Sequence, residues 1–152
     1  MQFRDYGVIA IKVSSHLHEP SEGLILISEY PGYSIYEETN PSTGKDTSRM
    51  LQSGAAKVYY IEIIERDTLF KAFTEIVSKV PVNTPVICES VSLVDFVEPG
   101  VFALMISDNN VNPKDITEIR KVKHIEMSLE GVTETDILPF SFYDGMWSIS
   151  QI

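Results

Sequence analysis

The chain is poor in the residues that build disulfide frameworks and metal centres. Among its 152 residues it has a single cysteine and 3 histidines. One cysteine excludes an internal disulfide, and the place of Cys88 in an apolar run favours a small core residue over a reactive thiol. His16 and His18 stand two apart in a polar segment, which is a weak pattern for metal ligands. We therefore predict no metal centre, and a small metal-dependent hydrolase built on His16, His18 and Glu89 is an alternative.

Positive charge and long apolar runs are also scarce. The chain has 12 Lys and Arg against 22 Asp and Glu, a net charge of −10. Such a surface repels nucleic acid and anionic lipid, because both require neutralisation by Lys and Arg. No apolar stretch approaches the roughly 20 residues that span a bilayer, and Met1–Tyr6 is too polar for a secretory signal. We expect a cytoplasmic protein without nucleic-acid or membrane partners.

A phosphate-binding loop is missing as well. Such a loop needs the pattern G-x-x-x-x-G-K-[ST] between a strand and a helix. The nearest segment is Ser42–Thr47, but its first glycine position is Thr39 and the residue after Lys45 is Asp46. An acidic residue at that position would repel the phosphates, so the segment is excluded as a loop of this type.

What the chain does have is an alternation of strand-like and helix-like segments. Hydrophobic residues make up 43% of the chain, and its length indicates a single domain, residues 1–152. The expected strands are Gly7–Val13, Leu24–Ser28, Tyr33–Glu37, Lys57–Ile64, Pro85–Cys88, Val101–Ile106 and Lys123–Met127. The expected helices are Asp46–Ser53, Thr68–Lys79 and Pro113–Arg120, with Val91–Val97 either a short helix or a loop. The alternation between residues 57 and 127 is typical of parallel β-α-β units.

Two turn signals predict hairpins in addition. Tyr30-Pro31-Gly32 lies between two strand-like runs, and Asp144-Gly145 separates Phe140–Tyr143 from Met146–Ile149. The second hairpin falls in a C-terminal appendage, residues 138–152. The prediction is an α/β domain with a mainly parallel sheet, flanking helices and added β-hairpins.

Polar residues directly after apolar runs are the candidate site residues, because open parallel sheets bind ligands at the carboxyl ends of their strands. Glu89 follows the run Pro85–Cys88, which we expect to be buried on both faces. A glutamate there can bind Mg²⁺ or polarise an attacking water, so Glu89 is the candidate catalytic residue. A cap or loop carboxylate is the alternative. Glu37-Glu38 is interpreted as a solvated strand end.

Several segments, in order, resemble the MobB-type P-loop proteins of molybdopterin-guanine dinucleotide synthesis. Ala10–His16 resembles that family's Ile-Lys-His segment after its second strand. Gly44–Arg49 followed by Ser53–Ala55 resembles its Gly-Lys-Asp-Ser-x-Arg … Ala-Gly-Ala stretch. Val86–Ser90 resembles its Walker-B-like strand end, and looks closer still to uncharacterised bacterial relatives with Ile-Ile-Glu-Ser there. The likeness covers about residues 7–121.

The resemblance implies a P-loop NTPase-like fold, with Lys12, Asp46 and Arg49 as cofactor-binding residues beside Glu89. The chain departs from the family at its start, where the family has a strand, a Walker A loop and a helix. Here residues 3–7 resemble the end of that helix, and the family's histidine after Lys12 is Val13. The tail, residues 138–152, matches nothing in the family.

The absent strand is central in P-loop folds, and a central gap exposes backbone donors and acceptors. Either the sheet closes up or another chain fills the gap, so the expected partners are a second copy through the sheet and a nucleotide. The residues identify no cofactor. The resemblance implies a degenerate P-loop-NTPase-like binding or assembly domain, linked to molybdenum-cofactor or nucleotide metabolism. The alternatives are an N-terminally truncated GTP- or ATP-binding enzyme of the MobB type and the metal-dependent hydrolase.

Overall fold

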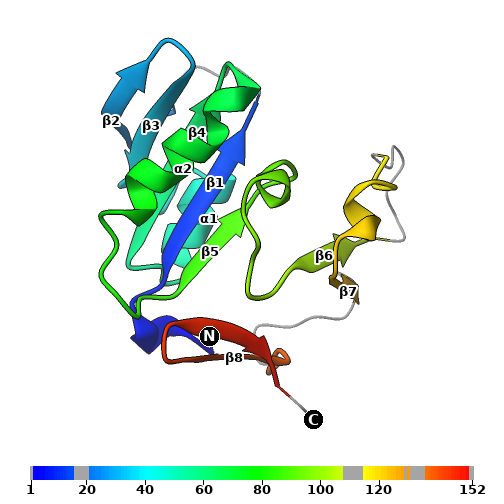
Figure 1. Ribbon diagram of the computed structural model, residues 1–152. Coiled ribbons are helices and arrows are strands. Elements are labelled where there is room, and N and C mark those ends of the chain that lie inside the picture. Colours follow the sequence, from blue (N-terminus) through cyan, green and yellow to red (C-terminus); the bar gives the residue numbers. More distant parts are fainter. Residues whose placement is uncertain (1, 16–20, 108–114, 129, 131–135, 151–152) are drawn as a thin grey trace.

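A five-stranded mixed sheet forms the centre of the computed structural model, which describes residues 2–15, 21–107, 115–128, 130 and 136–150 (Figure 1). Its strands are β1 (Ile9–Ser14), β2 (Leu24–Tyr30), β3 (Tyr33–Glu38), β4 (Lys57–Ile63) and β5 (Val86–Glu89). The α-helices are α1 (Asp46–Gln52) and α2 (Leu69–Val77). Two small sheets pair β6 (Ala103–Ile106) with β7 (Ile125–Ser128), and β8 (Phe140–Tyr143) with β9 (Met146–Ile149). Short 3₁₀ turns occupy Arg4–Tyr6, Arg66–Thr68, Leu93–Asp95 and Ile119–Lys121.

The strand order of the main sheet is β2-β3-β4-β1-β5. Strands β4, β1 and β5 run parallel, whereas β2, β3 and β4 are antiparallel neighbours. Since β1 is paired on both sides, the centre of the sheet has no gap. The two edges of the sheet are β2 and β5.

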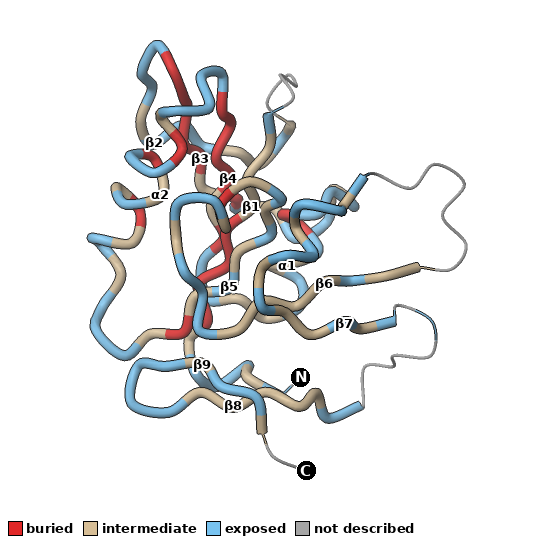
Figure 2. The backbone as a smooth tube through the Cα atoms, turned by 45° about the vertical axis from the view of Figure 1, so that its right-hand side comes forward, coloured by how far each residue is buried: buried red, intermediate tan, exposed pale blue. Residues whose placement is uncertain are grey.

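The two faces of the sheet differ in chemistry because side chains alternate along each strand. The apolar face packs against α2 and holds the core residues Ile9, Ile11, Tyr33, Ile35, Ile61, Ile63, Leu69, Ala72, Ile76 and Leu93. The opposite, polar face is covered by α1 and holds the buried residues Ser34, Glu38, Thr47, Ser48 and Glu62. Burial is concentrated in β1, β3 and β4, the middle of the sheet (Figure 2). The sheet thus combines an apolar face with a face that holds charged and hydroxyl groups.

The predicted fold class is wrong. The expectation was a mainly parallel sheet flanked by helices, as in P-loop NTPases. The described part of the chain is predominantly β, and its only α-helices have 7 and 9 residues. The β2–β3 hairpin adds two antiparallel strands to one side of the sheet, and β6 and β7 pair with each other instead of extending it. A short apolar run predicts a strand but not the strand that it pairs with. The alternation of strands and helices in the sequence therefore did not predict the pairing in the sheet.

Individual elements follow the predictions more closely than the fold does. The expected helix Thr68–Lys79 begins as a 3₁₀ turn and continues as α2. The expected helix Pro113–Arg120 is also wrong: residues 115–118 are not helical, only Ile119–Lys121 forms a 3₁₀ turn, and residues 113–114 lie outside the described ranges. The C-terminal hairpin forms where predicted, with φ of 49° at Asp144 and 76° at Gly145 as a type I′ turn requires.

The C-terminal hairpin lies beside the N-terminal segment (Figure 1). The Gln2 amide donates hydrogen bonds to the Leu138 and Phe140 carbonyls at 3.1 and 3.0 Å. The Phe3 and Trp147 rings meet edge to face, with centroids 4.9 Å apart. Residues from both ends of the chain therefore form a small aromatic cluster.

Candidate functional site

Three of the four residues predicted for the site meet at one place. Lys12 lies in β1 directly opposite Glu89, the last residue of β5, and Asp46 is the first residue of α1. The Lys12 ammonium donates a hydrogen bond to Asp46 Oδ2 at 3.0 Å and another to Glu89 Oε1. Residues far apart in the sequence are thus joined in what we call the Lys12 cluster, formed by Lys12, Asp46 and Glu89.

Arg49 does not join the Lys12 cluster. It is exposed on α1, and its side chain makes no hydrogen bond or ion pair with the described residues. Of the residues that the resemblance assigns to cofactor binding, the structure brings together Lys12 and Asp46 alone.

The Lys12 cluster lies where neighbouring parallel strands send the chain in opposite directions. After β1 the chain crosses to the β2–β3 hairpin at one side of the sheet, and after β5 it leaves on the other side toward β6 (Figure 1). In open sheets such a point, at the carboxyl ends of the strands, is the usual place for a ligand. The position of the cluster therefore agrees with a binding site, and its charges decide what it can bind.

The Lys12 cluster combines one positive charge with two negative charges. Burial lowers the pKa of Lys12, but hydrogen bonds and charge from Glu89 and Asp46 outweigh burial and raise that pKa above its usual value. Lys12 is therefore a permanent ammonium near neutral pH and not a general base. Since two carboxylates already surround one ammonium, the cluster does not attract a phosphate.

A buried carboxylate next to this cluster escaped the sequence analysis. Glu38 was interpreted as part of a solvated strand end, but its side chain is only 2% exposed. It accepts hydrogen bonds from the Asn40 backbone N–H at 2.9 Å and from Thr47 Oγ1 at 2.8 Å. These bonds anchor the loop that leads into α1 and so help to place Asp46. The alternation of side chains along β3 could have indicated this burial, because it sets Glu38 on the same face as Ser34 and Tyr36.

Metal and thiol chemistry find little support. Within the described ranges no group of three or more His, Cys, Asp or Glu residues is arranged to hold a metal ion. His16 and His18 lie outside those ranges. Burial, with a smaller contribution from Glu89, raises the pKa of the Cys88 thiol to about 12, so the thiol stays protonated.

A second surface lies at the edge strand β2, which pairs with β3 and with no other described strand. Most of β2 is exposed (Figure 2). The exposed fractions of its large apolar residues are 55% for Ile25, 49% for Leu26, 43% for Ile27 and 44% for Tyr30. A bulge between Leu26 and Ser28 shifts the register with β3. Three consecutive aliphatic side chains are therefore half-exposed on both sides of one edge strand.

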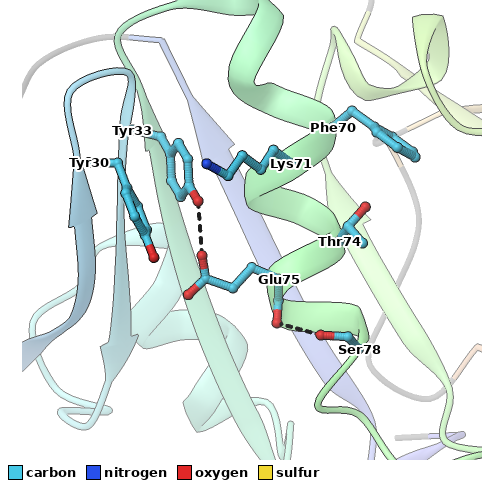
Figure 3. Close-up of a pocket in the computed structure, with 7 residues that line it drawn as sticks. All are labelled: Tyr30, Tyr33, Phe70, Lys71, Thr74, Glu75 and Ser78. Carbon is cyan, nitrogen blue, oxygen red and sulfur yellow. Dashed lines mark hydrogen bonds between the residues drawn. The ribbon is translucent and has the colours of Figure 1, made fainter.

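A shallow groove of about 620 Å³ lies between the turn of the β2–β3 hairpin and α2 (Figure 3). Lys71 and Glu75 point from α2 toward Tyr30 and Tyr33, and the Lys71 ammonium lies 4.9 Å from the centroid of the Tyr30 ring. Glu75 accepts hydrogen bonds from Tyr33 at 2.9 Å and from Ser28 at 2.6 Å.

These contacts shift two pKa values in opposite directions. Burial, helped by the Glu75 carboxylate, raises the pKa of Tyr33 to about 12. Burial also tends to raise the pKa of Glu75, but the hydrogen bonds from Ser28 and Tyr33 outweigh it and hold that pKa below its usual value. The sequence analysis predicted the strands here and missed the groove, because α2 and the hairpin meet only in the folded chain.

The opposite edge of the sheet is covered. Strand β5 has 4 residues, and the Trp147 indole N–H donates a hydrogen bond at 3.1 Å to the carbonyl of Val86. The C-terminal hairpin thus occupies part of the β5 edge, whereas β3 is the only described strand that pairs with β2.

No family model matches the chain, and no curated protein or solved structure matches it either. The MobB resemblance therefore stays a prediction. None of the helices in the described ranges has the length and apolar character needed to cross a membrane.

Proposed function

We propose that this chain is a protein-binding domain that takes up an extended segment of a partner at the free edge of β2. The observation that carries the proposal is the run Ile25–Ile27, three half-exposed aliphatic residues on a strand that no described segment pairs with along one side. An edge strand presents backbone N–H and C=O groups to an incoming strand, and side chains on either face set specificity.

The first half of the β2 edge has little of the usual protection against such pairing among the described residues. Edge strands in soluble proteins are guarded by charged residues, especially lysine, by proline, by a bulge or by a covering segment. Leu24–Ser28 contains neither lysine nor proline, whereas β5 is short and partly covered by Trp147. The bulge after Leu26 limits the regular edge to its first half, and the net charge of −10 opposes indiscriminate association. These features favour recognition of a short segment over open-ended aggregation.

The Lys12 cluster supports a binding role over hydrolysis. Its ammonium donates to Asp46 and Glu89, and the second carboxylate leaves the cluster with a net negative charge, which disfavours a phosphate. We assign the Lys12 cluster a structural role, because its hydrogen bonds connect the ends of β1 and β5 to the start of α1. A link to molybdenum-cofactor or nucleotide metabolism stays a prediction from the resemblance.

A short fluorescent peptide of alternating Val and Thr, with Lys at both ends, tests the proposal by anisotropy. The wild-type protein should bind it, and Ile25→Lys should weaken binding at least about tenfold, because a charge would be desolvated in the new strand pair. Ile87→Lys is the matched control, since Ile87 is 47% exposed on the other edge strand. Methylating alternate backbone nitrogens of the peptide should also abolish binding. Equal binding by wild type and Ile25→Lys, or none by wild type, would refute the proposal.

A further inference from the structure

We infer that the segment taken up at β2 is β2 of a second copy of this chain, paired antiparallel about a two-fold axis at Ile25. The inference rests on the proposed function and names its partner. The two sheets would then join edge to edge into one continuous sheet across the dimer. A symmetric dimer of this kind uses the same surface on both copies.

The side-chain faces of β2 select the axis. Ile25 lies opposite Glu37 of β3 on the apolar face of the sheet, whereas Leu24 and Leu26 lie opposite Glu38 and Tyr36 on the polar face. An axis at Ile25 sets Ile25 against its own copy and Leu24 against Leu26 of the second copy. Each pair then shares a face, as cross-strand pairs must.

An axis at Leu26 fits less well because of the bulge. It would set Leu24, on the polar face, against Ser28, which turns toward α2 and donates to Glu75. With the axis at Ile25 the paired strand residues are Leu24–Leu26, which end before the register shift at Ile27. The bulge thus marks the end of the pairing.

The charges around β2 act against the pairing at its two ends and not at its centre. Residues 23–27 carry no charge, but Glu22 would face Ser28 of the second copy and lie beside its Glu29. The two copies of Glu29 would stand on the order of 25 Å apart, beyond the Debye length of about 8 Å at physiological salt. What opposes the dimer is the net charge of −10 on each copy, a long-range repulsion that salt weakens.

The buried area matches a weak dimer. Half-exposed Ile and Leu side chains offer on the order of 100 Å² each, so Ile25, Leu26 and Ile27 offer about 300 Å² per copy. With the backbone edge, both copies together bury less than about 1,000 Å², which is the range of weak, transient interfaces. We expect a dissociation constant in the upper micromolar range.

Sedimentation equilibrium measures this association. The wild type should dimerise with rising concentration, and raising the salt should tighten the dimer, because the interface is apolar and the repulsion is screened. Ile25→Lys should weaken dimerisation at least about tenfold, whereas Ile87→Lys should leave it unchanged. A wild type that stays monomeric at high micromolar concentration, or a dimer that salt loosens, would overturn the inference.

Cysteine cross-linking tests the register. In a Cys88→Ala background, Ile25→Cys places two thiols directly opposite across the axis, close to the Cβ separation that a disulfide needs. Ile25→Cys should therefore form an intermolecular disulfide at least about tenfold faster than Leu26→Cys or Ile27→Cys. Faster cross-linking at either of those positions would overturn the register. Circular dichroism of each variant confirms that it is folded.

The peptide experiment separates this inference from the proposed function. A wild type that binds the Val-Thr peptide but stays monomeric retains the strand-binding function and rules out the second copy as partner. A wild type that neither binds the peptide nor dimerises refutes both.

Discussion

Lys12 joins three elements, β1, β5 and α1, and the removal of its ammonium should show how much these contacts contribute to stability. Lys12→Met keeps the length of the side chain but deletes the ammonium that Asp46 and Glu89 share. We expect a loss of about 1 kcal/mol in the free energy of unfolding at pH 7, measured by urea denaturation. Lys121→Met is the control, because Lys121 and its partner Glu118 are 65% and 81% exposed. A loss no larger than in the control would show that the Lys12 cluster does not stabilise the fold.

The pH dependence of this difference follows from the raised pKa of Lys12. A group whose pKa is higher in the folded than in the unfolded state contributes stability below its unfolded pKa, here about 10.5. That contribution is lost as the pH rises through the higher folded pKa. The gap between wild type and Lys12→Met should therefore be constant from pH 7 to about 10 and shrink above that.

Tyr33 offers a spectroscopic test of the groove beside α2. Its pKa is raised to about 12, so one of the 7 tyrosines should ionise last in a phenolate absorbance titration. Since Tyr33 is neutral in the fold when the unfolded phenol already ionises, stability should fall between pH 10 and 12. Tyr33→Phe should remove the late ionisation and cost about 1 kcal/mol at pH 7. Tyr30→Phe, at an exposed position, should do neither.

The loop that precedes α1 determines the position of Asp46 at the start of that helix. The Glu38 carboxylate holds the loop before α1 through Asn40 and Thr47, and both Glu38 and Thr47 are buried. Thr47→Val keeps the shape of the side chain but leaves Glu38 without one of its donors, which should cost about 1–3 kcal/mol. Urea denaturation measures the loss, and amide hydrogen exchange at residues 39–45 should accelerate. Thr74→Val, on the exposed side of α2, is the matched control, and an equal loss there would contradict the anchoring role.

The helices and strands show how far the sequence could predict the structure. Hairpin turns and the start and end of α2 were predictable, because Asp144-Gly145 and Pro81 act on their immediate neighbours. Strand pairing was not, because the order β2-β3-β4-β1-β5 depends on which surfaces meet in the folded chain. Glu89 was predicted from its place directly after an apolar run and Lys12 from the family resemblance, and their contact follows from the β1–β5 register. Arg49 failed because α1 presents it to solvent.

For the whole molecule, charge opposes both nucleotide binding and self-association, but it does so in different ways. An apolar edge can overcome a net charge of −10 once salt screens it, because its attraction does not depend on charge. A triphosphate has no such compensation here. It needs free cations or a cradle of backbone N–H groups, and the sequence contains no G-x-x-x-x-G-K-[ST] motif.

Titration calorimetry with GTP and Mg²⁺ should therefore give no binding heat, and no phosphate should be released on incubation. Glu89→Gln should behave identically, because in our account Glu89 holds Lys12 and does not act on a nucleotide. A micromolar dissociation constant for wild type that Glu89→Gln preserves, with turnover lost, would instead make Glu89 a catalytic residue. In that case Lys12 would have to share its ammonium between the phosphate and its two carboxylate partners, Asp46 and Glu89.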